Sequence, residues 1–227
     1  MPTARLTVWS DYLCPWCYNA AVRLERMEAE FGAALEIEWR SYLLRPHPKG
    51  GAAGFPAEDD PPRRVSAEAL EKFRRYAQSW QRPAAEPDAA PFRIPALAGE
   101  AGSDPAPPSH SVPAQVAAKA AAALGRDAFR ALHAGLLAAY FREHRDISDR
   151  ATLRSVWTGA GLPAADFARC DDPALLSATL REHEEAVAAG VTGAPTARME
   201  GNDALILGAN PLALYRRWIE RKLDGRI

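Results

Sequence analysis

Two cysteines are the residues best placed to do chemistry, in the segment Cys14-Pro15-Trp16-Cys17. The chain has only 3 cysteines, so a chance spacing of three residues between two of them is a rare outcome. Two thiols at this spacing can form a disulfide, or one can resolve a mixed disulfide held by the other. The spacing therefore favours thiol–disulfide exchange.

A metal site is the alternative for the same cysteines. A structural zinc site needs four ligands, often from a second pair of cysteines or histidines three to five residues apart. The remaining candidates are Cys170 and five histidines that show no such spacing: His47, His110, His133, His144 and His183. The pattern favours redox chemistry, and we expect no bound metal.

The elements around the two cysteines predict a strand, a turn and a helix. Residues 5–9 alternate in the manner of a short strand, and a helical apolar period runs from Cys17 to a stop near Gly32. Pro15 is tolerated in the first turn of a helix. A helix N-terminus stabilises a thiolate, so we expect Cys14 to be the attacking thiolate, more exposed than Cys17, the resolving thiol.

Charged residues of this helix are predicted to lie mostly on the face opposite its apolar residues: Arg23, Glu25, Arg26 and Glu30.

The rest of the chain completes a familiar order of elements. Residues 35–39 alternate as a second strand, and residues 196–199 and 204–207 flank a short turn, which indicates an antiparallel hairpin. Asn210-Pro211 is predicted to cap a final helix. The order β-α-β … β-β-α is that of an α/β thioredoxin fold with a large helical insertion. We assign residues 1–63 and 190–227 to the thioredoxin-like domain and 64–189 to the insertion.

The middle of the chain is rich in proline, and residues 46–113 hold 13 of the 19 prolines. This composition predicts extended loops over 46–63 and 83–113, separated by one helix over 67–81 that Ser66 caps. Further helices are predicted over 114–124, 127–144, 150–160, 163–169 and 173–189, with Asp149 and Asp172 as N-caps.

Several segments resemble the DsbA-like oxidoreductases of the FrnE type. They are residues 10–18, 39–46, 140–147, 190–196 and 207–211. The resemblance implies a disulfide–dithiol exchange enzyme with a cis-proline, Pro195, facing the cysteine pair. It also implies that Pro15, Trp16, Ala194 and Pro195 contact substrate, the Ala194 backbone pairing with an extended chain. For Trp16, simple packing beside the helix is an equal alternative.

Relatives that carry serine in place of the first cysteine resemble 2-hydroxychromene-2-carboxylate isomerases and kappa-class glutathione transferases. This chain keeps both cysteines. A glutathione-dependent isomerase or transferase acting on a small aromatic substrate is therefore the second hypothesis. A redox-sensing or zinc-binding interaction module is the third. No cofactor is expected beyond the redox-active disulfide, with glutathione as a potential reductant.

Composition excludes other classes of partner. The formal net charge is −1, which gives no positive field for nucleic acid or an anionic membrane. The longest apolar stretch is far shorter than a membrane span, and residues 5–9 lead directly into a polar turn without a secretory signal. We therefore expect a cytoplasmic protein whose partners are thiol- or disulfide-containing proteins or small molecules.

Other conspicuous residues receive structural interpretations. Asp11 is expected to form the turn before Cys14, rather than to accept a proton from Cys17. Cys170 is expected to be a bystander thiol. The Ser109-His110-Ser111 segment is predicted to be a surface loop; the alternative is that it lines the site if the insertion folds over it. Residues 181–185 are predicted to be a solvated helix face. His133, His144 and His183 are expected on helices and not as ligands.

Overall fold

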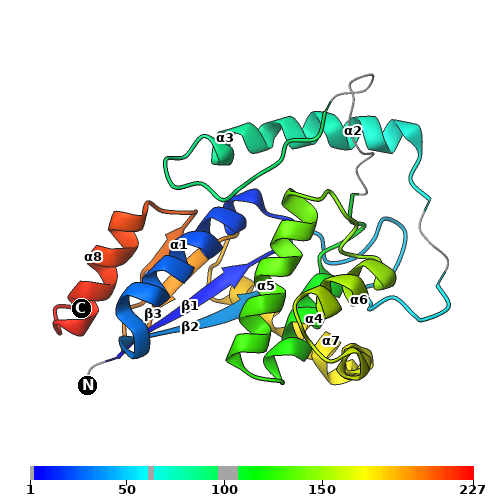
Figure 1. Cartoon of the computed structure of the whole chain (residues 1–227). Coiled ribbons are helices and arrows are strands. Elements are labelled where there is room, and N and C mark those ends of the chain that lie inside the picture. The colour runs from blue at the N-terminus through cyan, green and yellow to red at the C-terminus, as the bar shows by residue number, and fades with distance from the viewer. Residues whose placement is uncertain (1–2, 61–63, 97–106) are drawn as a thin grey trace.

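The structure is a computed structural model that describes residues 3–60, 64–96 and 107–227. Its centre is one mixed sheet with the strand order β2-β1-β3-β4 (Figure 1). β1 pairs in parallel with β2 and antiparallel with β3, and β3 pairs antiparallel with β4. The strands are β1 (Ala4–Ser10), β2 (Leu35–Ser41), β3 (Thr196–Met199) and β4 (Leu205–Leu207). The predicted βαβ unit and hairpin are confirmed.

The helices follow the predicted order. They are α1 (Pro15–Phe31), α2 (Ala67–Ala77), α3 (Gln81–Ala84), α4 (Val112–Ala122), α5 (Arg126–Phe141), α6 (Arg150–Gly159), α7 (Pro173–Ala188) and α8 (Leu212–Leu223). Leu6 and Val8 of β1 pack with α1 and α8, whereas Trp9 packs with Ala186 of α7. Side chains alternate across a strand, so the two faces of the sheet are covered by different helices.

The insertion lies between β2 and β3 and shares a core with the thioredoxin elements. One buried cluster contains Tyr12 and Tyr18 from the first cysteine segment and Trp80, Phe141 and Trp157 from the insertion. α2 and α3 run across the top of the molecule, above the N-terminal end of α1 (Figure 1). The fold class is confirmed, and the boundaries at 63/64 and 189/190 stay a prediction.

Most local expectations in the insertion hold. Ser66 accepts a hydrogen bond from the Ala69 N–H, so it caps α2 as predicted. The segment expected as one helix over 67–81 forms α2, which ends at Ala77, then a 3₁₀ turn, and then the start of α3. The segment predicted as a helix over 163–169 is a 3₁₀ helix, Ala164–Asp171. The helix predicted over 127–144 ends at Phe141, so His144 is not on a helix as expected and has a positive φ of 58°. The described parts of 46–63 contain no helix or strand; 61–63 and 97–106 lie outside the described residues.

Arg23 is buried, although it belongs to the charged residues of α1. Its side chain is 1% exposed, because the segment after α3 and the loop before α8 cover it. The guanidinium pairs with Asp88 at 2.5 Å and donates to the backbone oxygens of Ala209 and Asn210. An arginine fork can satisfy several acceptors at once, which makes its burial tolerable.

The face of α7 over 181–185 is also not simply solvated, contrary to prediction. Glu182 accepts a hydrogen bond from the Ser41 N–H at 2.7 Å, and His183 Nδ1 accepts one from the Leu43 N–H at 3.1 Å. β2 is an edge strand, so its outward amides need partners from outside the sheet. Two polar side chains of α7 provide them.

Asn210 does not cap α8 as predicted. The residue at the cap position is Pro211, which has no side-chain acceptor. The Asn210 amide donates instead to the carbonyl oxygens of Leu207 and Gly208, 3.3 and 2.9 Å away. It therefore stabilises the turn that enters the helix, because its N–H groups find acceptors there.

No helix among the described residues has the length and apolar character to cross a membrane.

Candidate active site

The first cysteine stands at the predicted start of α1. Cys14 is the N-cap residue, in an extended conformation, and Pro15 occupies the first helical turn. The Cys14 N–H donates to the Asp11 carbonyl at 3.1 Å, and the Cys17 N–H donates to the Cys14 carbonyl at 3.0 Å. Cys14 is therefore held where the unpaired N–H groups of a helix N-terminus lie.

Cys14 and Cys17 are not joined by a disulfide in this structure, and both are buried. Cys14 is 4% exposed and Cys17 is 0% exposed, so Cys14 is only slightly the more accessible of the two. The Cys14 thiol donates to the carbonyl oxygen of Ala194 at 3.2 Å. This contact brings together two predicted site residues that are 180 positions apart in sequence.

Cys17 lies in an environment that keeps it protonated. Burial raises the pKa of the Cys17 thiol well above its usual range, and the neighbouring Cys14 side chain raises it further. The Asp11 N–H donates to Cys17 Sγ at 3.4 Å. A buried thiol of high pKa is a poor initial nucleophile, which leaves Cys14 as the better candidate for attack.

The bond between Ala194 and Pro195 is cis, as the resemblance implied. The Pro195 carbonyl accepts a hydrogen bond from the Gly208 N–H at 2.8 Å, and Thr196 Oγ1 donates to the Gly193 carbonyl at 2.7 Å. These bonds fix the segment that approaches Cys14. The proposed pairing of the Ala194 backbone with a substrate chain stays a prediction.

Asp11 forms the turn, as expected, and also ties it to distant segments. It is fully buried, and its Oδ1 accepts from the Leu13 N–H at 2.7 Å. Its Oδ2 accepts from the Leu44 N–H, after β2, at 2.6 Å, and Ser111 hydrogen-bonds the same carboxyl group. Burial raises the pKa of Asp11. The bonds of this carboxyl group are with Leu13, Leu44 and Ser111, while the Asp11 backbone contacts Cys17.

The Ser109-His110-Ser111 segment is not the surface loop that was predicted. His110 is 7% exposed and Ser111 is 0% exposed. Ser111 accepts from the Arg45 N–H at 3.2 Å and contacts Asp11, while His110 Nε2 lies 3.2 Å from the Gly54 carbonyl. The proline-rich loops pack around this segment. Ser111 therefore belongs to the support of the site, although nothing in its local sequence indicates this.

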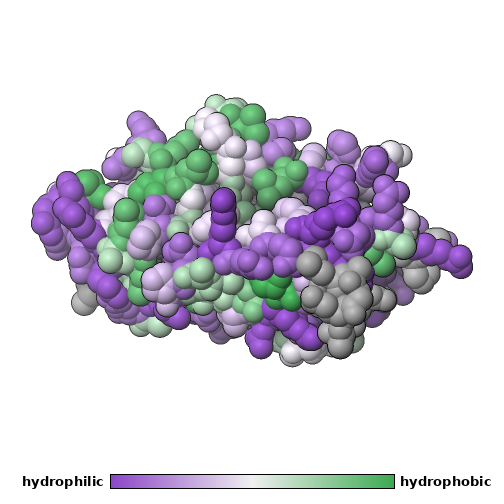
Figure 2. Space-filling view, turned by 90° about the horizontal axis from the view of Figure 1, so that it is seen from above, coloured by the Kyte–Doolittle hydropathy of each residue, from purple (hydrophilic) through white to green (hydrophobic). Residues whose placement is uncertain are grey.

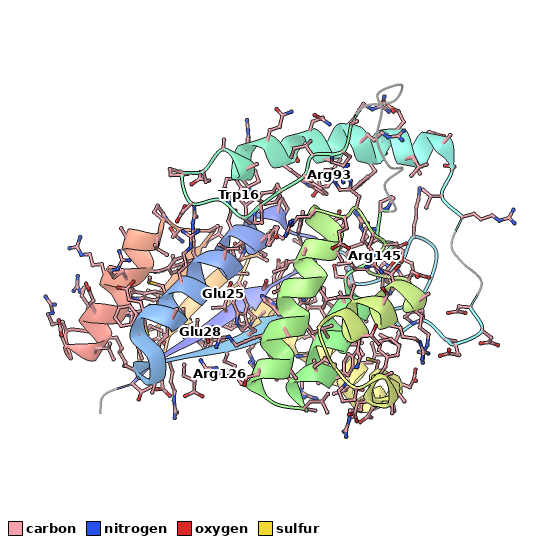
Figure 3. The ribbon with its side chains drawn as sticks, in the orientation of Figure 1. Trp16, Glu25, Glu28, Arg93, Arg126 and Arg145 are labelled. Atoms are coloured by element: carbon pink, nitrogen blue, oxygen red, sulfur yellow. The ribbon has the colours of Figure 1, made fainter. Side chains whose placement is uncertain are left out.

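Partly exposed apolar side chains lie around the cysteines. Pro15 and Trp16 are partly exposed, and Figure 3 shows Trp16 at the N-terminal end of α1, close to α3. Leu44, whose N–H donates to Asp11, is 50% exposed, and Leu207, which lies beside Gly193, is 57% exposed. Figure 2 views the molecule from above, the side on which α2 and α3 lie, and shows apolar surface interrupted by polar residues. The contact roles predicted for Pro15 and Trp16 stay predictions.

Cys170 is buried and has a raised pKa, and the described residues offer no cluster of metal ligands. Cys170 is 1% exposed, and burial raises the pKa of its thiol to about 12. Within residues 3–60, 64–96 and 107–227, no group of three or more histidine, cysteine or acidic side chains is placed to hold a metal ion.

The family model for the DsbA-like thioredoxin domain matches residues 5–220. The chain therefore belongs to the DsbA-like thioredoxin family. Among curated proteins, the uncharacterized protein YwbO of Bacillus subtilis is 41% identical over 46 residues. That alignment covers 20% of this chain and 22% of YwbO, so it concerns only about a fifth of either protein.

Solved structures share the fold over nearly the whole chain. A Nitrosomonas europaea protein, assigned provisionally as a protein disulfide isomerase, has a TM-score of 0.71 and 17% identity, covering 98% of both chains. The cytosolic disulfide reductase DsbM of Pseudomonas aeruginosa has a TM-score of 0.64 and 20% identity, covering 97% and 96%; it has also been solved with glutathione. A 2-hydroxychromene-2-carboxylate isomerase has a TM-score of 0.62 and 16% identity, and the match covers 98% of this chain and 97% of the isomerase. At these identities the likeness concerns the fold.

Proposed function

We propose that this protein is a thiol–disulfide oxidoreductase that works through Cys14 and Cys17. The observation that carries the proposal is the placement of Cys14 Sγ at the N-cap of α1, 3.2 Å from the Ala194 carbonyl beside cis-Pro195. Cys17 lies beneath it as a buried thiol with a raised pKa. One sulfur is thus set for attack and the other for resolution.

The exchange takes two balanced steps. The Cys14 thiolate attacks one sulfur of a substrate disulfide, forms a mixed disulfide and releases the other substrate sulfur as a thiolate, which takes up a proton. Cys17 then gives up its proton and attacks Cys14 Sγ, which releases the second substrate thiolate. The substrate disulfide is reduced to two thiols, and the enzyme is left with a Cys14–Cys17 disulfide. Run in reverse, the steps oxidise a dithiol.

We propose that the protein works in the cytoplasm and in the direction of reduction or isomerisation, because a reducing compartment disfavours stable disulfides. Glutathione is the proposed small-molecule reductant of the enzyme disulfide. The fold likeness to DsbM, a cytosolic disulfide reductase also solved with glutathione, supports this choice.

Single serine variants test the assignment. Cys14→Ser should reduce the rate of insulin-disulfide reduction to the uncatalysed background, and Cys17→Ser should accumulate a mixed disulfide at Cys14. Cys170→Ser is the matched control, because this third buried cysteine has no role in the two steps, and it should retain the full rate. Full insulin reduction by Cys14→Ser would show the proposal to be wrong.

A glutathione-dependent isomerase or transferase is the second candidate, favoured by the fold likeness to 2-hydroxychromene-2-carboxylate isomerase. The two candidates differ in what Cys14 holds in vivo. Purification of Cys17→Ser from cells, followed by mass spectrometry, should show Cys14 joined to protein partners if the protein exchanges disulfides. Glutathione as the sole adduct, with Cys17→Ser still active on an aromatic substrate, would favour the second candidate.

A further inference from the structure

A histidine buried between the sheet and the insertion has one ring nitrogen without a hydrogen-bond partner. His133 of α5 is 9% exposed, and its Nδ1 lies 2.8 Å from the Tyr12 hydroxyl. Its Nε2 is sealed from solvent and has no partner. Burial lowers the pKa of His133 to about 4, so the ring is neutral at pH 7. Buried polar atoms without a partner are uncommon in folded proteins and require an explanation.

Two cavities meet at this side chain. The larger, of about 200 Å³, lies between β2, α4, α5 and α7, and the smaller, of about 60 Å³, lies in the groove between α1 and α5. Trp39, Phe129 and His133 line both cavities. The Trp39 and Phe129 ring centroids lie 4.6 and 5.2 Å from that of His133. The space around the histidine is therefore largely aromatic.

Most charged groups at the two openings already have partners; Glu25, at the rim of the groove, is exposed to solvent. At the larger cavity, Lys119 pairs with Glu182 at 2.5 Å, and Arg40 pairs with Glu38 and Glu185. At the groove, Glu28 of α1 pairs with two arginines of α5, Arg126 at 2.6 Å and Arg130 at 3.3 Å. Figure 3 shows Glu25 and Glu28 on α1 and Arg126 at the start of α5. Paired charges of both signs favour an uncharged ligand.

We propose that this interface binds a small, uncharged aromatic molecule that carries one hydroxyl group. Its ring lies against Trp39 and Phe129, and its hydroxyl bonds to His133 Nε2. A hydroxyl group both donates and accepts, so it satisfies Nε2 in either tautomer of the neutral ring. Phe129 is only partly buried, so its ring can move aside to admit the ligand. The site is separate from the cysteine pair and does not depend on the proposed exchange reaction.

Titration calorimetry with p-cresol and toluene tests this directly, since the two probes differ only by the hydroxyl group. We expect one p-cresol site per chain, with an affinity at least tenfold higher than that for toluene. In His133→Phe the p-cresol affinity should fall at least tenfold, while the toluene affinity stays within threefold. No saturable p-cresol binding, or equal affinities for the two probes in the wild type, would overturn the proposal.

Two variants on α4 locate the binding without disturbing the core. Ala122 is exposed and lines the larger cavity, whereas the adjacent Ala123 is exposed and lies outside both linings. Ala122→Phe should weaken p-cresol at least tenfold by filling the opening, and Ala123→Phe should leave it unchanged. If both variants bind p-cresol like the wild type, the site is not at this interface, even where His133→Phe fails to fold.

Discussion

Asp11 shows how one buried side chain can join the reactive turn to elements far away in sequence. Its two carboxyl oxygens receive the N–H groups of Leu13 and Leu44, and Ser111 contacts the same group. Leu13 belongs to the turn, Leu44 follows β2, and Ser111 precedes α4. The carboxyl group therefore fixes the position of the turn before Cys14 with respect to the insertion.

Asp11→Asn should destabilise the protein, and the size of the loss should depend on pH. The asparagine NH₂ group would face a backbone N–H in place of an acceptor, which costs about 1–3 kcal/mol for a buried group. Burial raises the folded-state pKa of Asp11 above 3.8, so the folded wild type holds a proton that the unfolded chain releases. This proton-linked stability is present at low pH and is lost as pH rises through the folded-state pKa.

The free energy of unfolding in urea, measured at pH 5 and pH 8, checks this expectation. The difference between wild type and Asp11→Asn should be larger at pH 5 than at pH 8. The exposed Asp203→Asn is the matched control and should change stability little at either pH. A difference that grows with pH would contradict the raised pKa of Asp11.

At the scale of elements, polar side chains of α1 connect it to the segments that cover it. Asn19 Nδ2 donates to the Pro83 carbonyl at 2.9 Å, and its Oδ1 accepts from the Ala90 N–H at 2.7 Å. Arg23, one turn further along α1, binds Asp88 and the loop before α8. The helix that carries both cysteines is thus joined to α3 and α8 by buried hydrogen bonds.

Arg23→Leu should be strongly destabilising, because it leaves Asp88 and two backbone carbonyls without their donor. Removal of one partner from a buried charge pair costs about 3–5 kcal/mol. The measurement is the urea midpoint at pH 7 together with the slope of the transition. Arg169→Leu is the matched control, since it breaks an exposed pair with Asp166 and should shift the midpoint little. Equal shifts for the two variants would argue against a structural role for Arg23.

The sequence allowed the elements and the placement of Cys14 at the start of α1 to be predicted, because both depend on local patterns. The apolar period after Cys17, the position of Pro15 and the Ser66 cap all act within a few residues. Ser111, buried Arg23 and the edge contacts of Glu182 could not be predicted in this way. Their roles arise from segments 63 to 187 positions away, and a single sequence carries no signal for such pairings.

At the scale of the whole molecule, the insertion and the thioredoxin elements form one packed unit. Tyr18 of α1 stacks on Phe141 of α5, with ring centroids 5.5 Å apart, and Phe141 contacts Trp80 at 4.9 Å. These aromatic contacts join α1 to α5 and to the 3₁₀ turn between α2 and α3. Titratable groups buried at the junction therefore affect the stability of the whole chain.

Buried histidines should make the protein sensitive to acid. Burial lowers the pKa values of His110, His133, His144 and His183, and that of His133 falls from 6.5 to about 4. As the pH falls, the unfolded chain binds protons at these rings at a higher pH than the folded chain does. The contribution of the neutral histidines to the free energy of unfolding is therefore present above pH 6.5 and is lost progressively below it. His133 alone accounts for a loss of about 2 kcal/mol between pH 7 and pH 5. Asp11 acts in the opposite direction, because burial raises its pKa.

His133→Gln separates this contribution from the others, because glutamine does not titrate and its amide can still pair with the Tyr12 hydroxyl. Urea unfolding at pH 7 and pH 5 should show the wild type losing about 2 kcal/mol more than the variant over this interval. The change in the free energy of unfolding that the variant still shows between pH 7 and pH 5 then reports the other histidines and Asp11 together. If wild type and variant lose the same stability on acidification, His133 is not held neutral by burial, and an uncharged ligand partner for its Nε2 loses its physical basis.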